Sequence, residues 1–209
     1  MTVDRHPRLF LESSLARSIE GLLRQLDVRV ALSEQVNVYI AGGVAVHLYT
    51  GVRTTTDLDA EFSKRFHVPN DVAVAIPDES GEPRIIYLDT NYNSTFGLMH
   101  ENYQEDAIPV EFDVPHFRVF VLSPVDLVVS KIARLAENDR EDILALVAAG
   151  LTTADEIEAR AEDAITSFVG SHEMLRLNLR DALTIARDAE SNRRSTLQRG
   201  SRDEPDFCP

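Results

Sequence analysis

The sequence is poor in cysteine and in long apolar runs. Its single cysteine, Cys208, stands next to the last residue in a polar segment, which excludes an internal disulfide and a closed metal site built on thiolates. The first residues lack the basic start and apolar run of a secretory signal, and no later stretch approaches membrane-spanning length. We therefore expect a cytoplasmic protein without a membrane segment.

Positive charge is also scarce. Acidic residues outnumber basic residues 35 to 21, and the formal charge is −14. Such an excess opposes long-range attraction to nucleic acid or to an anionic membrane. A local basic site stays open, because a bound divalent metal supplies positive charge that a residue count omits. The composition argues against non-specific binding of nucleic acid over a broad surface.

The hydrophobic pattern predicts an α+β fold. A chain of 209 residues with 44% hydrophobic content can bury one core with a small helical appendage. Helical spacing over roughly residues 9–27 is followed by the short β-branched run VNVYIAGG, and further short strands are expected from 71 to 122. These segments predict a mixed sheet with flanking helices.

The pattern changes at Ser123-Pro124. A serine cap, a proline at the first helical position and apolar residues at helical spacing predict two helices, broken near Asn138-Asp139, and two more follow. We expect a core over residues 1–122, a helical region over 123–190 packed on that core, and a mobile tail over 191–209, which has no periodicity.

One constellation has the residue types that phosphoryl-type transfer requires. Gly42-Gly43 ends a strand, and Asp57-Leu58-Asp59 follows after 13 intervening residues. Glycines allow close backbone approach to phosphates, and paired carboxylates hold magnesium against phosphate oxygens. Alternation along the RTTTDLDAEF strand places Asp57 and Asp59 on one face. An isolated Asp-Leu-Asp is usually a solvated strand or turn, so the glycines and the order carry the prediction.

These residues resemble the nucleotidyltransferase fold, and in particular its AbiEii-like and MenT-like branch from toxin–antitoxin and abortive-infection systems. That branch reads Arg-x-Thr-x-Asp-hydrophobic-Asp, which stands here as residues 53–59. It continues with a Ser-Pro helix carrying a lysine and then an Asp-rich helix start, matched by Ser123-Pro124, Lys131 and residues 139–142. The resemblance covers roughly residues 36–148, and it implies that residues 39–142 contain the metal-binding half of such a domain.

The resemblance implies a role for each matched residue. Asp57 and Asp59 would bind Mg²⁺ (or Mn²⁺), Gly42 and Gly43 would admit a nucleoside triphosphate, and Lys131 would contact its phosphates. Asp142 would orient or deprotonate the acceptor. The branch commonly has serine where this chain has Gly43.

Three of these residues can also be explained by a purely structural role. Lys131 can extend from the edge of an apolar helix face, and Asp142 can serve as a first-turn acid of its helix. Arg53 either contacts nucleotide or pairs locally with Asp57 or Asp59.

A third carboxylate often completes such a metal site. Glu111 and Asp113 in IPVEFDV are the candidates because alternation puts them on one face, and we prefer Asp113. The alternative is that both are solvent-facing acids of an edge strand.

The resulting hypothesis is a magnesium-dependent nucleotidyltransferase that moves a nucleoside monophosphate onto a hydroxyl of RNA, such as a tRNA 3′ end, or of protein. The resemblance implies that the protein is the toxin of a toxin–antitoxin pair, with a cognate antitoxin as a possible partner. The rival readings are an antitoxin that nucleotidylates its cognate toxin, and a non-catalytic binding module of the same fold.

Overall fold

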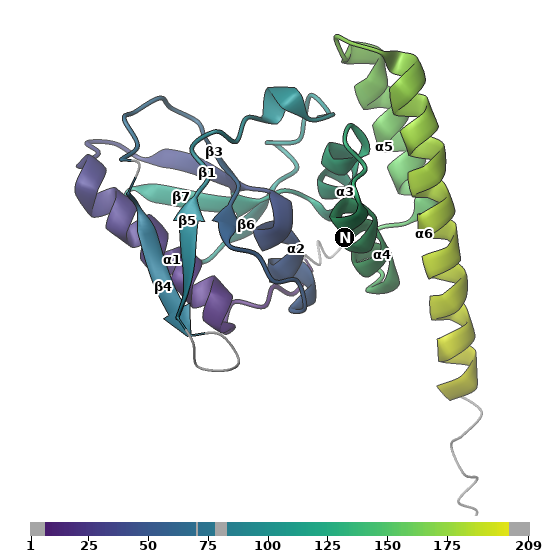
Figure 1. Cartoon of the computed structure of the whole chain (residues 1–209), viewed down its shortest axis with the longest axis horizontal. Coiled ribbons are helices and arrows are strands. Elements are labelled where there is room, and N and C mark those ends of the chain that lie inside the picture. The colour runs from purple at the N-terminus through teal and green to yellow at the C-terminus, as the bar shows by residue number, and fades with distance from the viewer. Residues whose placement is uncertain (1–6, 70, 78–82, 201–209) are drawn as a thin grey trace, which may run out of the picture.

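The computed structural model describes residues 7–69, 71–77 and 83–200. Cys208 and the end of the expected tail, 201–209, lie outside these residues. Within them the chain has the expected α+β architecture, with mixed sheets, six α-helices and a helical C-terminal region (Figure 1). No described helix is both long and apolar enough to cross a membrane.

The strands form two sheets. The larger sheet has the order β3-β1-β7-β6, made from β1 (Val36–Ile40), β3 (Ala60–Phe62), β6 (Ile108–Val110) and β7 (Phe117–Val121). β1 and β7 are parallel, whereas β3 and β6 run antiparallel to their neighbours. The smaller sheet has the order β2-β5-β4, made from β2 (Asp57–Leu58), β4 (Ala73–Pro77) and β5 (Pro83–Leu88).

The predicted first helix is α1 (Ser14–Val30), whose N-cap Ser13 accepts a hydrogen bond from the Ala16 N–H at 3.1 Å. It packs on β4 and β5 through a continuous buried stripe. The short helix α2 (Gly42–Thr50) follows β1 and is buried along most of its length. A single turn of 3₁₀ helix, η1 (Ser94–Phe96), lies in the segment after β5.

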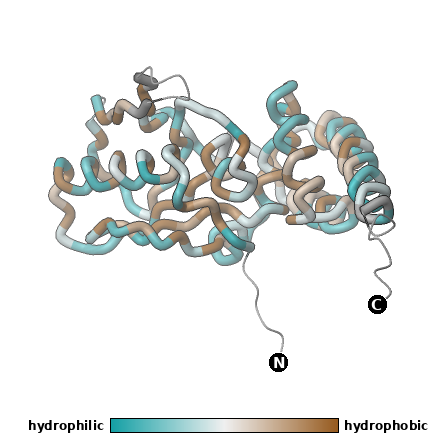
Figure 2. Tube along the Cα trace, turned by 90° about the horizontal axis from the view of Figure 1, so that it is seen from below, coloured by the Kyte–Doolittle hydropathy of each residue, from teal (hydrophilic) through white to brown (hydrophobic). Residues whose placement is uncertain are grey.

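The helical region starts at α3 (Pro124–Ile132) and continues through α4 (Glu137–Ala148), α5 (Ala154–Ser167) and α6 (His172–Gly200). α3 and α4 pack on α2, and α5 and α6 pack on α3 and α4, so α6 forms the side away from the strands (Figure 1). Figure 2 shows hydrophobic stretches running through the strands and hydrophilic stretches on outer helix turns. Whether residues 123–190 form a separate unit stays a prediction.

Two predicted helix boundaries differ from the structure. The break between α3 and α4 lies at residues 133–136, earlier than Asn138-Asp139, because Leu135 takes a left-handed conformation with φ of 45°. α6 continues to Gly200, through residues 191–200 of the segment expected to be a mobile tail. There Ser195 and Thr196 donate hydrogen bonds to carbonyls one turn earlier, and neither proline nor glycine interrupts the chain before Gly200.

Candidate active site

The glycine turn between β1 and α2 is shaped around Asp59. Gly42 begins α2 with φ of +60°, and a Cβ added to Gly42 would overlap Asp59 Oδ2 and lie 2.6 Å from Asp59 Cγ. Gly43 is packed against Thr55, 3.1 Å from its Cβ by the same construction. The N-cap Ala41 makes no side-chain capping bond, so the first N–H groups of α2 keep their hydrogen-bonding capacity at this turn.

Asp57 and Asp59 lie where the chain passes from one sheet to the other. Asp57 belongs to β2 of the smaller sheet, and Asp59 separates β2 from β3 of the larger sheet. The predicted continuous strand is therefore divided at Asp59. The Asp59 carbonyl accepts a hydrogen bond from the Ala41 N–H at 2.9 Å, which joins the second aspartate to the glycine turn.

A third carboxylate, Asp89, comes from the neighbouring strand. β2 and β5 are parallel, and Asp57 pairs with Tyr87 and Leu58 with Leu88. The Asp89 N–H donates to the Leu58 carbonyl at 3.0 Å, so Asp89 continues this register beside Asp59. Burial, followed by the charges of Asp89 and Asp57, raises the pKa of Asp59 to about 6. The positive charges near Asp59 are therefore too few to offset its burial and the neighbouring carboxylates.

The expected cation, Lys131, is held between acidic side chains of α4. Its Nζ donates to Asp142 Oδ2 at 2.7 Å and lies 3.5 Å from Asp139 Oδ1. Asp142 and Lys131 are both buried, with side chains 3% and 8% exposed. Arg53 Nε lies 3.0 Å from Asp142 Oδ1, although its N–H is not aligned for a hydrogen bond. Arg53 thus pairs with Asp142 rather than with Asp57 or Asp59.

A second cation, Arg134, reaches the same site from the end of α3. Asp139 accepts from Arg134 Nε and Nη2, both at 2.8 Å, and this bidentate pairing raises the pKa of Arg134. The Arg134 side chain remains 74% exposed, and its charge together with that of Lys131 lowers the pKa of Asp59 against the larger effect of burial. Arg134 is therefore a fixed cation that solvent can reach.

These elements enclose a cavity of about 560 Å³. The glycine turn and the strands contribute Gly42, Asp59 and Asp89 to its wall, and α3 contributes Lys131. The segment after β5 supplies polar side chains, and the complete lining is Gly42, Asp59, Asp89, Asn91, Tyr92, Asn93, Ser94, Gly97, Met99, Ser130, Lys131, Ala133, Arg134 and Asp139. Acidic groups and fixed cations thus face one space of nucleotide size.

A family model covers most of the chain. Residues 19–190 match the family DUF6036, described as "nucleotidyltransferase of unknown function". The chain belongs to this family. Neither the curated proteins nor the solved structures contain a significant match to it.

Within this nucleotidyltransferase-family chain the structure brings together most of the residues singled out from the sequence. Gly42, Asp59 and Lys131 line the cavity. Asp57 does not line it, but lies close enough to Asp59 for its charge to raise the pKa of Asp59. Arg53 and Asp142 lie behind Lys131 and are absent from the cavity wall. The residues that sequence reasoning missed are Asp89 and Arg134, together with Asp139, which had been noted only as part of the acidic helix start.

Asp113 is not brought to the aspartate pair. β6 runs antiparallel to β7 and ends at Val110, which places the residues after it beyond the end of the sheet where β1 begins. Asp59 lies at the opposite end, beside Ile40 and Ala41. The Asp113 side chain is exposed and lies 3.1 Å from Arg24 of α1, and Glu111 is also exposed.

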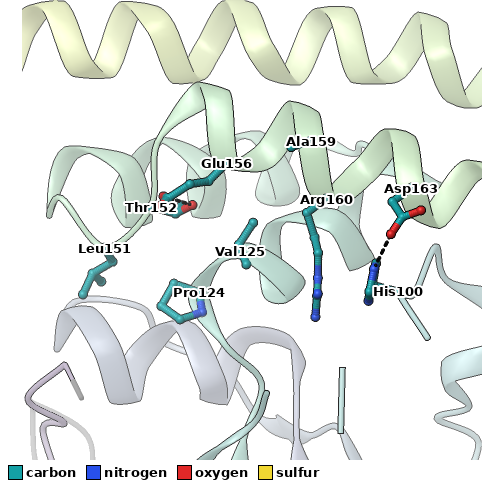
Figure 3. Close-up of a pocket in the computed structure, with 9 residues that line it drawn as sticks. All are labelled: His100, Pro124, Val125, Leu151, Thr152, Glu156, Ala159, Arg160 and Asp163. Atoms are coloured by element: carbon teal, nitrogen blue, oxygen red, sulfur yellow. Dashed lines mark hydrogen bonds and ion pairs between the residues drawn. The ribbon is translucent and has the colours of Figure 1, made fainter. Parts of the chain in front are cut away.

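A further cavity, of about 470 Å³, shares no lining residue with the first (Figure 3). It lies between the N-terminal end of α3, the 98–106 segment and α5. His100 Nε2 donates to Asp163 Oδ2 at 2.8 Å there, and Arg160 makes two hydrogen bonds to buried Asp126. Its polar groups are already paired with one another, so it is not the active-site candidate.

Proposed function

We propose that this chain is a magnesium-dependent enzyme that transfers a nucleoside monophosphate from a nucleoside triphosphate to a hydroxyl group and releases pyrophosphate. The observation that carries the proposal is the half-buried Asp59, which lies beside two further carboxylates and the glycine turn and shares its cavity with Lys131 and Arg134. Membership of the nucleotidyltransferase family supports the reaction class.

The donor atoms around Asp59 suit a hard cation. Asp57 and Asp59 would hold Mg²⁺ or Mn²⁺, since such ions are usually bound by one or two carboxylates together with substrate phosphates and water. Among the described residues, no group of three or more Asp, Glu, His or Cys side chains is arranged to hold a metal alone. The raised pKa of Asp59 marks where positive charge is lacking. When bound, the ion would neutralise charge that builds up on the phosphate oxygens.

Other groups at the cavity would bind the triphosphate of the donor nucleotide. The uncapped N–H groups at the start of α2 carry partial positive charge that favours a bound anion, and Gly42 leaves room for the Asp59 carboxylate beside this helix start. Arg134, held by Asp139, presents its remaining N–H groups to the β- and γ-phosphates. Lys131 adds charge to the same wall.

We assign Asp142 a positioning role in place of direct contact with the acceptor. It lies behind Lys131, joined to Lys131 on one oxygen and to Arg53 on the other, and it is absent from the cavity wall. This arrangement fixes the Lys131 ammonium group and the segment that leads into Asp57.

The acceptor and the biological setting rest on the motif resemblance. We propose the toxin of a toxin–antitoxin pair, which modifies RNA such as a tRNA 3′ end or a protein hydroxyl. An antitoxin that nucleotidylates its toxin and a non-catalytic binding module are the alternatives. Intact Asp57 and Asp59 favour catalysis, because half-buried, mutually repelling carboxylates cost stability without a counter-ion.

Transfer is tested by incubating the protein with Mg²⁺, each α-labelled nucleoside triphosphate, and either total RNA or a protein extract. We expect label to enter one macromolecular fraction with the wild type and to be lost with Asp57→Asn/Asp59→Asn. Asp113→Asn is the matched control, because Asp113 is exposed at the other end of the sheet, and it should label as the wild type does. Equal labelling by the double variant would contradict the assignment, and label absent from both fractions would favour the binding module.

A further inference from the structure

A flat apolar surface lies beside Asp57 on the outer side of the smaller sheet. We define the Tyr87 face as Tyr87 and Ile85 of β5 with Ala73 and Ala75, their register partners on β4. The alternate residues of β5, Ile86 and Leu88, point inward and are buried on the side that α1 covers (Figure 1). The Tyr87 face therefore points away from the core.

Nothing in the described part of the chain covers this face. Tyr87 and Ile85 are 48% and 56% exposed. Within the described residues the Tyr87 ring has no aromatic neighbour, and its hydroxyl has no hydrogen-bond partner. Phe10 and Tyr87 are the only aromatic side chains among the exposed large hydrophobic residues that the structure describes. A contiguous exposed apolar surface beside half-buried carboxylates is typical of a binding site.

The register places the ring next to the aspartates. Tyr87 pairs directly with Asp57 across the parallel β2–β5 pair, so both side chains project from the same face. Neighbouring strands are about 4.8 Å apart, and residues two apart on one strand are separated by about 6.7 Å. A group bound at Asp57 is thus one strand spacing from Tyr87, and Ile85 extends the apolar surface beyond it.

The charges fix the direction in which a bound nucleotide would lie. Lys131 and Arg134 line the cavity with Asp59 and Asp89, whereas Tyr87 and Ile85 do not line it. In the proposed reaction the β- and γ-phosphates face those cations, and the α-phosphate lies at Asp57 and Asp59. The nucleoside then extends from the α-phosphate away from the cations, toward the Tyr87 face.

We propose that the Tyr87 face binds the base of the donor nucleotide by stacking on the Tyr87 ring. This inference rests on the proposed function and deepens it, because it names the part of the donor that this surface recognises. Every base has an aromatic face, so stacking binds bases without selecting strongly among them. The site accordingly accepts all four nucleoside triphosphates with similar affinity.

The experiment compares Mg²⁺-dependent binding of two kinds of ligand by titration calorimetry. Inorganic tripolyphosphate probes the phosphate-binding cavity alone, and ATP, GTP, CTP and UTP probe the cavity together with the Tyr87 face. Tyr87→Ala removes the ring, Tyr87→Phe keeps it, and Phe10→Ala is the matched control, because Phe10 is equally exposed but packs on Gly51 at the other end of α2.

We expect Tyr87→Ala to weaken binding of each nucleotide roughly tenfold, as loss of one base–aromatic stack predicts, and to leave tripolyphosphate binding unchanged. Tyr87→Phe and Phe10→Ala should stay within about twofold of the wild type for every ligand. Unchanged nucleotide binding by Tyr87→Ala overturns the inference, as does an equal loss for tripolyphosphate. If the wild type binds neither ligand, the proposed function fails and the inference with it.

Discussion

At the scale of single residues, the charge of Asp59 lowers the stability of the folded state. Its pKa of about 6 lies above the usual 3.8 because burial and the neighbouring carboxylates oppose its charge. The folded state therefore holds this proton more tightly than the unfolded state does. The free energy of unfolding falls as pH rises from about 4 to about 6, and the cost persists above that range.

Asp59→Asn should therefore stabilise the metal-free protein at pH 8 while abolishing transfer. A shift of about two pKa units corresponds to a gain of at most about 3 kcal/mol. Urea denaturation of wild type and variant at pH 8 and pH 4 tests this. The difference should be much smaller at pH 4, where the wild-type carboxyl is protonated in the folded state and about half protonated in the unfolded state. A variant that is less stable at pH 8 would show that Asp59 has a stabilising partner.

At the scale of elements, the buried pairing between α3 and α4 fixes the cationic wall of the cavity. Lys131, Arg53 and Asp142 form one connected group, in which the Lys131 and Asp142 side chains are buried and the Arg53 side chain is 26% exposed. Removal of one partner from a buried ion pair leaves an uncompensated charge, which costs about 3–5 kcal/mol. Exposed ion pairs contribute about 0–1 kcal/mol.

Lys131→Met is thus expected to destabilise the protein by about 3 kcal/mol, and Lys131→Met/Asp142→Leu by less than the two single changes together. A double-mutant cycle by chemical denaturation measures the coupling. Arg24→Met is the control, because it breaks only surface pairs, with Asp113 and Glu20, and should change the free energy of unfolding by less than about 1 kcal/mol. Additive effects of Lys131 and Asp142 would argue against a coupled pair.

The way in which the strands pair also explains how much of the site could be predicted from the sequence. Gly42, Asp57 and Asp59 were recognisable because they form a short local motif. Asp89 was missed because its place depends on parallel pairing of β2 with β5, and strand partners are not encoded in local periodicity. Asp113 was proposed because alternation defines the face of a strand, but alternation does not say at which end of the sheet a residue lies.

The same limit applies to helix boundaries. The periodicity of α3 and α4 predicted both helices, but the left-handed Leu135 that separates them has no signal of its own in the sequence. Arg134 was overlooked for that reason, because it lies at this turn and is directed by Asp139 of the next helix. The α+β class was predictable because it depends on the pattern of whole segments.

At the scale of the whole molecule, α6 supports the helical region along one side. Its buried residues pack on α4 and α5 and comprise Leu175, Leu179, Ala182, Leu183, Ala186 and Ala189. Residues 191–200 continue the helix with polar side chains that are exposed wherever burial is described, except for the half-buried Arg193. Residues 172–190 of α6 are therefore part of the core, and residues 191–200 add little buried surface.

Two truncations test this division. A chain ending at Glu190 should unfold within a few degrees of the full chain, because the removed segment buries little apolar surface. A chain ending at Gly170 should fail to fold cooperatively, because the apolar faces of α4 and α5 lose their cover. Circular dichroism during thermal unfolding distinguishes the two, and a cooperative transition in the shorter chain would show that residues 1–170 form an independent unit.

The position of Asp59 between the two sheets gives the molecule a mechanical property. Asp57 belongs to one sheet and the residues after Asp59 belong to the other, so a single residue, Asp59, spans the junction. Any rotation of one sheet against the other changes the separation of the two carboxylates. The distance between the Asp57 and Asp59 carboxylates therefore depends on the angle between the two sheets. A ligand that binds both carboxylates would hold that angle constant.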